Sequence, residues 1–139
     1  DPRVFIWTGD HLSNRGELPA KANYEIMRKL FLEDEAGKTI SEYLIEKGYA
    51  RIALYAITDI AKALMRILKD QPIEIESIYD RNTTLKNWNG LAVNKPTNEN
   101  LSNMQVPLLV TLVARHNEME DFLRRHGYEG EVLCLNAIV

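Results

Sequence analysis

The segment 51–81 constrains the fold most strongly, because it reads as a strand, a tight turn, a helix and a second strand. The apolar run 52–56 lacks polar alternation, which is typical of a strand buried on both faces of a parallel sheet. Thr58 is placed to cap the helix that follows, and the second strand, residues 73–79, ends at Asp80. This order predicts the opening βαβ unit of an open α/β sheet.

Strands and helices continue to alternate after this unit. Short apolar runs predict strands at residues 91–93, 107–113 and 131–135, and an amphipathic pattern predicts a helix at 117–126. With right-handed crossovers, this alternation predicts an α/β fold, namely a Rossmann-like parallel sheet of about five strands flanked by helices. The expected strand order is 3-2-1-4-5.

Two helices are expected to precede the sheet as an N-terminal arm. The first has Tyr24, Met27 and Leu30 on its apolar side, and Gly37 is expected to end it. Residues 39–42 have the form of a capping box and predict the start of the second helix. The predicted organisation is a single compact domain, with an N-terminal arm or loop at residues 1–20, a two-helix arm at 21–48 and a Rossmann-like domain at 49–139.

Composition and charge exclude several classes of protein. The chain is 45% hydrophobic and 27% charged, with a net charge of −3, and this slight acidity argues against nucleic acid as a main partner. No apolar stretch approaches the ~20 residues of a transmembrane helix. Cys134 is the only cysteine, so no disulfide framework is possible and a reducing, cytoplasmic location is expected.

The turn after the first strand departs from the glycine pattern of dinucleotide-binding folds. Ala56, Thr58 and Ala61 occupy the three glycine positions. Thr58 places a β-branched side chain where a pyrophosphate would approach the backbone, and Asp59 adds a negative charge at the same helix start. A full pyrophosphate cradle is therefore not expected.

Asp80 is the most cofactor-like residue that remains, because an acid at the end of the second strand commonly binds ribose hydroxyls. The alternative is that Asp80 only caps the turn that follows it. Arg81 and Arg115 are the cations of this region that are placed to bind a phosphate. The candidate cofactor-binding crevice consists of Ile57, Thr58, Asp59, Asp80, Arg81, Asn82, Thr111 and Arg115.

The sequence contains no recognisable catalytic constellation. His11, His116 and His126 lie far apart along the chain, and no nucleophile elbow, zinc-binding helix or P-loop is present. We predict no catalytic residues and no metal ligands. These observations argue against enzymatic activity of this chain alone.

Several stretches carry a resemblance to a known group of domains. Residues 37–55, 78–82, 108–111 and 133–136 together resemble the small Rossmann-like domains attached to bacterial glycosyltransferases and other cell-surface polysaccharide biosynthesis proteins. The resemblance implies a non-catalytic accessory domain that contacts other protein domains or weakly binds a nucleotide or nucleotide-sugar. In that group the first turn usually keeps glycines, and this chain does not.

Two alternatives stay open. One is an oxidoreductase or epimerase domain that uses NAD(P) or a nucleotide-sugar. The other is a structural module that forms a homodimer through the helices at 24–44 and an arm containing Phe5 and Trp7.

Overall fold

The computed structural model describes residues 21, 23–30 and 35–138 of the 139-residue chain. The arm or loop predicted at residues 1–20 lies outside the described residues. Residues 23–30 are helical. The elements that follow are α2 (Ala36–Glu46), β1 (Arg51–Tyr55), α3 (Asp59–Ile67), β2 (Glu74–Tyr79), β3 (Asn87–Trp88), β4 (Leu91–Asn94), α4 (Asn98–Ser102), β5 (Leu108–Val110), the 3-10 turn η1 (Val113–Arg115), α5 (His116–Arg125), β6 (Val132–Cys134) and α6 (Leu135–Ile138).

The sheet has six strands in the order β3-β4-β2-β1-β5-β6. Every neighbouring pair is parallel except β3 and β4, which form a short antiparallel pair. The predicted α/β class and its parallel sheet are therefore confirmed. The predicted number and order of strands differ from the structure, because Asn87 and Trp88 add an edge strand too short to show any alternation. Without β3, the parallel strands follow each other as β4-β2-β1-β5-β6.

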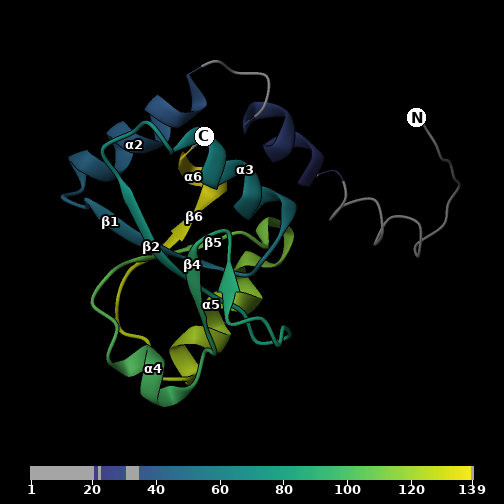
Figure 1. Ribbon diagram of the computed structural model, residues 1–139, viewed down its shortest axis with the longest axis vertical. Helices are drawn as coiled ribbons and strands as arrows, with labels where there is room; N and C mark the ends of the chain where they lie inside the picture. The colour runs from purple at the N-terminus through teal and green to yellow at the C-terminus, as the bar shows by residue number, and fades with distance from the viewer. Residues whose placement is uncertain (1–20, 22, 31–34, 139) are drawn as a thin grey trace, which may run out of the picture.

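Helices cover both faces of the sheet, with α2, α3 and α6 on one side and α4 and α5 on the other (Figure 1). Successive side chains of β1 point to opposite faces, as the pleat of a strand requires. Ile52 and Leu54 pack in the core beneath α2, α3 and α6. Ala53 and Tyr55 belong to the second core, which α5 closes with Leu123. The sheet is thus buried on both faces, which explains the continuous apolar runs of its strands.

The helix at residues 23–30 packs against the first of these cores through Ile26 and Leu30, both of which are buried. Tyr24, which the sequence pattern places on the apolar side, is instead 66% exposed. The predicted helix is therefore confirmed over the described residues, but its buried face is rotated relative to the prediction. The apolar pattern was ambiguous because Tyr24 and Ile26 are two residues apart and lie on opposite sides of a helix, and the structure buries the side of Ile26 and Leu30.

α2 begins earlier than the sequence predicts. Its first residue is Ala36, no side chain caps it, and Gly37 lies inside the helix, so the predicted helix break and capping box are wrong. The physical reason is a close approach of two helices. A Cβ atom added to Gly37 would lie 2.3 Å from the carbonyl oxygen of Ile67, the last residue of α3. The lack of a side chain at Gly37 therefore allows α2 to approach the end of α3 closely.

The predicted strand at residues 107–113 is also shorter in the structure. β5 ends at Val110, which lies opposite Tyr55 at the end of β1 and Cys134 at the end of β6. The Thr111 amide still donates to the Tyr55 carbonyl at 3.0 Å, but both neighbouring strands end at this level and the chain turns into η1. The last predicted strand is shorter too: β6 ends at Cys134, opposite Val110, and Leu135–Ile138 form α6.

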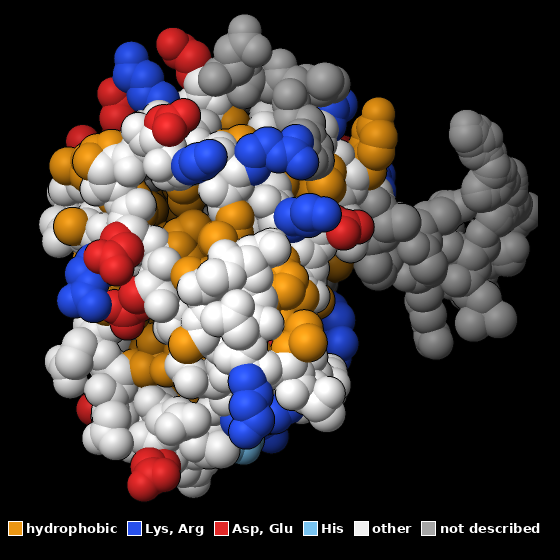
Figure 2. Space-filling view, viewed as in Figure 1, with side chains coloured by type: hydrophobic (Ala, Val, Ile, Leu, Met, Phe, Trp, Pro, Cys, Tyr) orange, Lys and Arg blue, Asp and Glu red, His pale blue; other side chains and the backbone are white. Residues whose placement is uncertain are grey.

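The described surface mixes charges of both signs. Figure 2 shows Lys and Arg side chains interspersed with Asp and Glu over the visible face, with apolar side chains between them. Among the described residues, none of the helices combines the length and apolar character that a membrane crossing requires.

Candidate functional site

The carboxyl ends of β1, β2 and β5 meet at one edge of the sheet. From this edge, β1 continues into α3 on one face, whereas β5 continues through η1 into α5 on the other. Two neighbouring strands therefore send their chains to opposite faces. Ligands of open α/β sheets bind in the crevice that such a divergence creates.

The turn that leaves β1 is held in an unusual backbone conformation. Ala56 has a φ of 88°, in the region that favours glycine, and its amide donates to the carbonyl of Tyr79 at 2.7 Å. The chain thus adopts the tight turn of a glycine motif with an alanine. Such strain persists where the surrounding structure holds it in place, and it is found preferentially at functional sites.

Asp80 ties this turn to the end of β2. One carboxylate oxygen, Oδ2, accepts a hydrogen bond of 2.9 Å from the Ile57 amide. The other, Oδ1, accepts one of 2.8 Å from the Asn82 amide. Both oxygens are therefore engaged with the main chain, and a ribose hydroxyl would have to share them.

A pair of threonines fastens the helix start to β5. Thr58 Oγ1 accepts a hydrogen bond of 3.1 Å from the Ala61 amide, as the sequence predicts for a capping residue. It also donates to Thr111 Oγ1 at 2.9 Å. Thr111 is buried, and its hydroxyl lies 2.7 Å from the carbonyl oxygen of Ala56. An amide that a phosphate would use is thus already bound within the protein.

A small cavity of about 40 Å³ opens beside this turn. A wider hollow of about 190 Å³ adjoins it, and Arg81, Arg115 and Met119 line both. The other residues that line the small cavity are Tyr55, Ala56, Asp80, Asn82 and Leu112.

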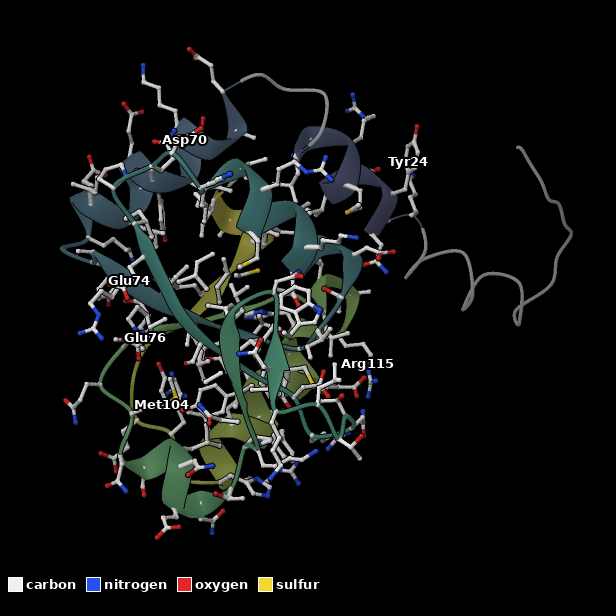
Figure 3. All side chains as sticks on the ribbon, viewed as in Figure 1. Tyr24, Asp70, Glu74, Glu76, Met104 and Arg115 are labelled. Carbon is white, nitrogen blue, oxygen red and sulfur yellow. The ribbon has the colours of Figure 1, made fainter. Side chains whose placement is uncertain are left out.

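Arg81 and Arg115 are the cations that line the small cavity, and Arg125 joins them in the wider hollow. The guanidinium of Arg81 lies 4.9 Å from the centre of the Phe122 ring. Arg115 forms an exposed ion pair of 2.9 Å with Glu118 one turn later. This pair raises the pKa of Arg115 and lowers the pKa of Glu118. Figure 3 shows Arg115 on the opposite side of the molecule from Glu74 and Glu76, which lie on β2 near its amino end.

Tyr55 is a site residue that the sequence reasoning missed. The residue is only 2% exposed, and it is among those that line the small cavity. Burial raises the pKa of its hydroxyl, whereas the positive charges of Arg81 and Arg115 act in the opposite direction. Among the described residues, no hydrogen-bond partner of this hydroxyl is seen. A tyrosine at the end of a buried strand was the available signal, but the sequence alone does not indicate which face it points to.

The structure brings only part of the predicted crevice to the cavity. Asp80, Arg81, Asn82 and Arg115 line it. The other predicted residues, Ile57, Thr58, Asp59 and Thr111, belong to the turn, the helix start and the strand end behind it. The sequence reasoning also missed Met119 in the small cavity and Phe122 in the wider hollow.

His116 is placed apart from the small cavity. It lines a separate open hollow with Cys134, and its Nε2 atom lies 3.5 Å from Glu120. In the described part of the chain, no group of three or more His, Cys, Asp and Glu side chains is arranged to hold a metal ion.

Comparisons of the chain with protein-family models, curated proteins and solved structures find no significant match. The arguments for function therefore rest on the geometry of the site and on the chemistry of its side chains.

Proposed function

We propose that this chain is a non-catalytic, Rossmann-like accessory module that binds a small phosphorylated ligand, a nucleotide or nucleotide-sugar, at the carboxyl edge of its sheet. The observation that carries the proposal is the cavity that joins Arg81 and Arg115 at the divergence of β1 and β5. Arginine is the side chain best suited to phosphate, because its planar guanidinium donates two parallel hydrogen bonds.

The hydrogen bonds of the turn favour weak binding over a dinucleotide cradle. Asp80 already holds the Ile57 amide, and Thr58 already holds the Ala61 amide. A pyrophosphate would have to displace these contacts, and it would also meet the negative charge of Asp59. Arg81 and Arg115 remain to bind the anion, since both line the cavity.

The biological setting that we propose is bacterial cell-surface polysaccharide assembly, and it rests on the sequence resemblance alone. Catalysis by this chain is the weaker alternative. An NAD(P)-dependent oxidoreductase or epimerase needs an acid or base beside the cofactor, and the residues that line the small cavity offer only Asp80, already bonded through both oxygens, and Tyr55.

Thermal unfolding in the presence of ligands tests the proposal. The chain is heated with millimolar NAD, NADP, UDP, CDP and UDP-sugars in parallel, as wild type and as Arg115→Gln. A ligand at 100 times its Kd adds about 2.7 kcal/mol, which is several degrees for a domain of this size. We expect a nucleotide or nucleotide-sugar to raise the melting temperature of the wild type and to raise that of Arg115→Gln less.

Arg51→Gln is the matched control, because it removes the same charge from the start of β1, at the opposite edge of the sheet. It should keep the full ligand-induced shift. Unchanged melting temperatures with every ligand would refute small-ligand binding and leave protein contacts as the function of the module.

A further inference from the structure

We infer that the ligand is a phosphate monoester and that three side chains, Tyr55, Arg81 and Arg115, recognise its phosphate. Glu118 competes with this phosphate for the guanidinium of Arg115. This inference rests on the proposed function and makes it specific. It assigns roles to Tyr55 and Glu118, and neither residue belongs to the turn after β1 in which dinucleotide-binding folds have their glycines.

Tyr55 supplies a neutral donor among the residues that line the cavity. Its ring packs in the core beneath α5, where it contacts Phe122 with 6.4 Å between ring centres. No hydrogen-bond partner of its hydroxyl is seen among the described residues, and the hydroxyl is not one of their fully buried unpartnered atoms, so it is accessible from the cavity that it lines with both arginines. A tyrosine hydroxyl can donate to an anionic oxygen, so an oxygen of a bound phosphate can accept from it.

Arg81 supplies a cation that is positioned without a carboxylate partner among the described residues. Its guanidinium lies over one ring, Phe122, and that ring is stacked against His126 with 4.1 Å between their centres. A contact with an aromatic ring orients a guanidinium but does not neutralise its charge. Arg81 therefore lies at the boundary of the small cavity and the wider hollow without an ion pair of its own among the described residues, although the carboxylates of Asp80, Glu118 and Asp121 line the same two spaces.

Arg115 supplies the second cation, and it forms an ion pair with Glu118. The pair is exposed on both sides, with 51% of the Arg115 side chain and 64% of the Glu118 side chain accessible. Exposed pairs of this kind are weak. A phosphate monoester carries more negative charge than a carboxylate and offers more acceptor oxygens, so that it competes well for the same guanidinium. The positive charge of Arg81 lowers the pKa of Glu118 further.

The size of the site favours one terminal phosphate. The small cavity of about 40 Å³ has room for little more than a phosphoryl group, and the wider hollow of about 190 Å³ can take the rest of the ligand. A pyrophosphate bound in the usual way would extend toward the amides of the turn, and Asp80 and Thr58 already occupy two of them. A monoester needs none of these amides.

Phosphorus NMR titration and calorimetry of the intact chain test the inference, with inorganic phosphate, AMP, UMP and UDP as probes and uridine as the ligand without phosphate. The variants are Tyr55→Phe, Arg81→Gln, Arg115→Gln and Glu118→Gln. Arg51→Gln and Glu74→Gln are controls that make the same charge changes at the opposite edge of the sheet.

We expect the mononucleotides and phosphate to bind, uridine not to bind, and UDP to bind no tighter than UMP. Loss of either arginine or of the tyrosine hydroxyl should weaken binding of the mononucleotide about tenfold. Glu118→Gln should tighten it about threefold, whereas both controls should leave it unchanged. Tyr55→Phe is the sharpest variant, because it removes one hydroxyl and keeps the buried ring.

The two levels of the proposal fail differently. Binding of nucleotides that is unaffected by the Tyr55, Arg81 and Arg115 variants would overturn the recognition by these side chains and leave a nucleotide-binding module. Tighter binding of UDP than of UMP would overturn the monoester class. Absence of binding by every probe, to the wild type and to Glu118→Gln, would overturn the proposed function itself.

Discussion

The main-chain amide of Ile57 donates a hydrogen bond of 2.9 Å to Asp80 Oδ2, and this bond joins the turn after β1 to the end of β2. In dinucleotide-binding folds, the residue at the position of Asp80 faces the ribose. Here its carboxylate also accepts from the Asn82 amide, so that it holds two loops together. The same residue therefore links the two loops that border the candidate site.

Asp80→Asn should destabilise the chain by about 1–3 kcal/mol. An asparagine side chain can accept only one of the two amide hydrogen bonds, and its NH₂ group would face the other amide. Urea unfolding of both proteins measures the difference. Asp70→Asn, in the turn that precedes β2, is a control of the same chemistry and should change the free energy of unfolding much less. Equal effects would show that the carboxylate of Asp80 has no special role.

Ala56→Gly should leave the stability nearly unchanged, although it removes a buried methyl group. At a φ of 88° an L-residue is strained, and glycine relieves about 1 kcal/mol of that strain. The loss of the methyl group costs about 0.8 kcal/mol, so the two effects almost cancel.

Ala53→Gly is the matched control for this substitution, because Ala53 is fully buried in the neighbouring part of β1 and is not among the positive-φ residues. It should cost about 1 kcal/mol more than Ala56→Gly, since no strain is relieved there. A cost at Ala56 as large as the cost at Ala53, measured by urea unfolding, would argue against strain in the turn.

Gly37→Ala should destabilise the chain, in spite of the better helix propensity of alanine. The added Cβ atom would lie 2.3 Å from the carbonyl oxygen of Ile67, and the helices must separate to admit it. Overpacking of this kind costs about 1–3 kcal/mol, compared with about 1 kcal/mol gained from propensity. Lys38→Ala, at an exposed position of the same helix, should be neutral or stabilising. A higher melting temperature of Gly37→Ala would contradict the close helix contact.

Glu131 should make the stability depend on pH in the acidic range. Its carboxylate accepts from Lys47 Nζ at 2.7 Å and from the Tyr49 hydroxyl, and these contacts hold the pKa of Glu131 below its usual value. A lowered folded-state pKa means that the stabilisation is complete above the unfolded-state pKa of about 4.3 and is lost as the pH falls through the lower, folded-state value.

Thermal unfolding between pH 7 and pH 3 measures this effect. The wild type should lose more stability over this range than Glu131→Gln, because the variant has no carboxylate to protonate. Glu46→Gln, exposed at the end of α2, is the control with the same change of charge. Identical pH profiles of the wild type and of Glu131→Gln would refute the role of this cluster.

The parts of the fold that follow from local chemistry could be predicted from the sequence. Thr58 caps α3, and Gly48 and Gly127 adopt positive φ where helices end. The parts that depend on tertiary contact could not. Gly37 looks like a helix break along the chain, and only its contact with Ile67 explains why it lies inside a helix.

The candidate site shows the same division. Arg81 and Arg115 could be chosen because they follow strands that end at one edge of a parallel sheet. Tyr55 could not, because a strand buried on both faces gives no pattern that tells which side chains meet a cavity. The wider hollow depends on how α5 lies over the strand ends, and Phe122 reads in the sequence only as an apolar helix residue.

The contact of α2 with α6 has a consequence for how the chain is made. The two helices come from opposite ends of the described sequence, and Lys47 at the end of α2 also pairs with Glu131, just before β6. During synthesis, the N-terminal helices emerge from the ribosome long before the strand and helix that complete their packing. Part of their apolar surface therefore stays uncovered until β6 and α6 have emerged, and the nascent chain is most vulnerable to chaperone capture or aggregation during this interval.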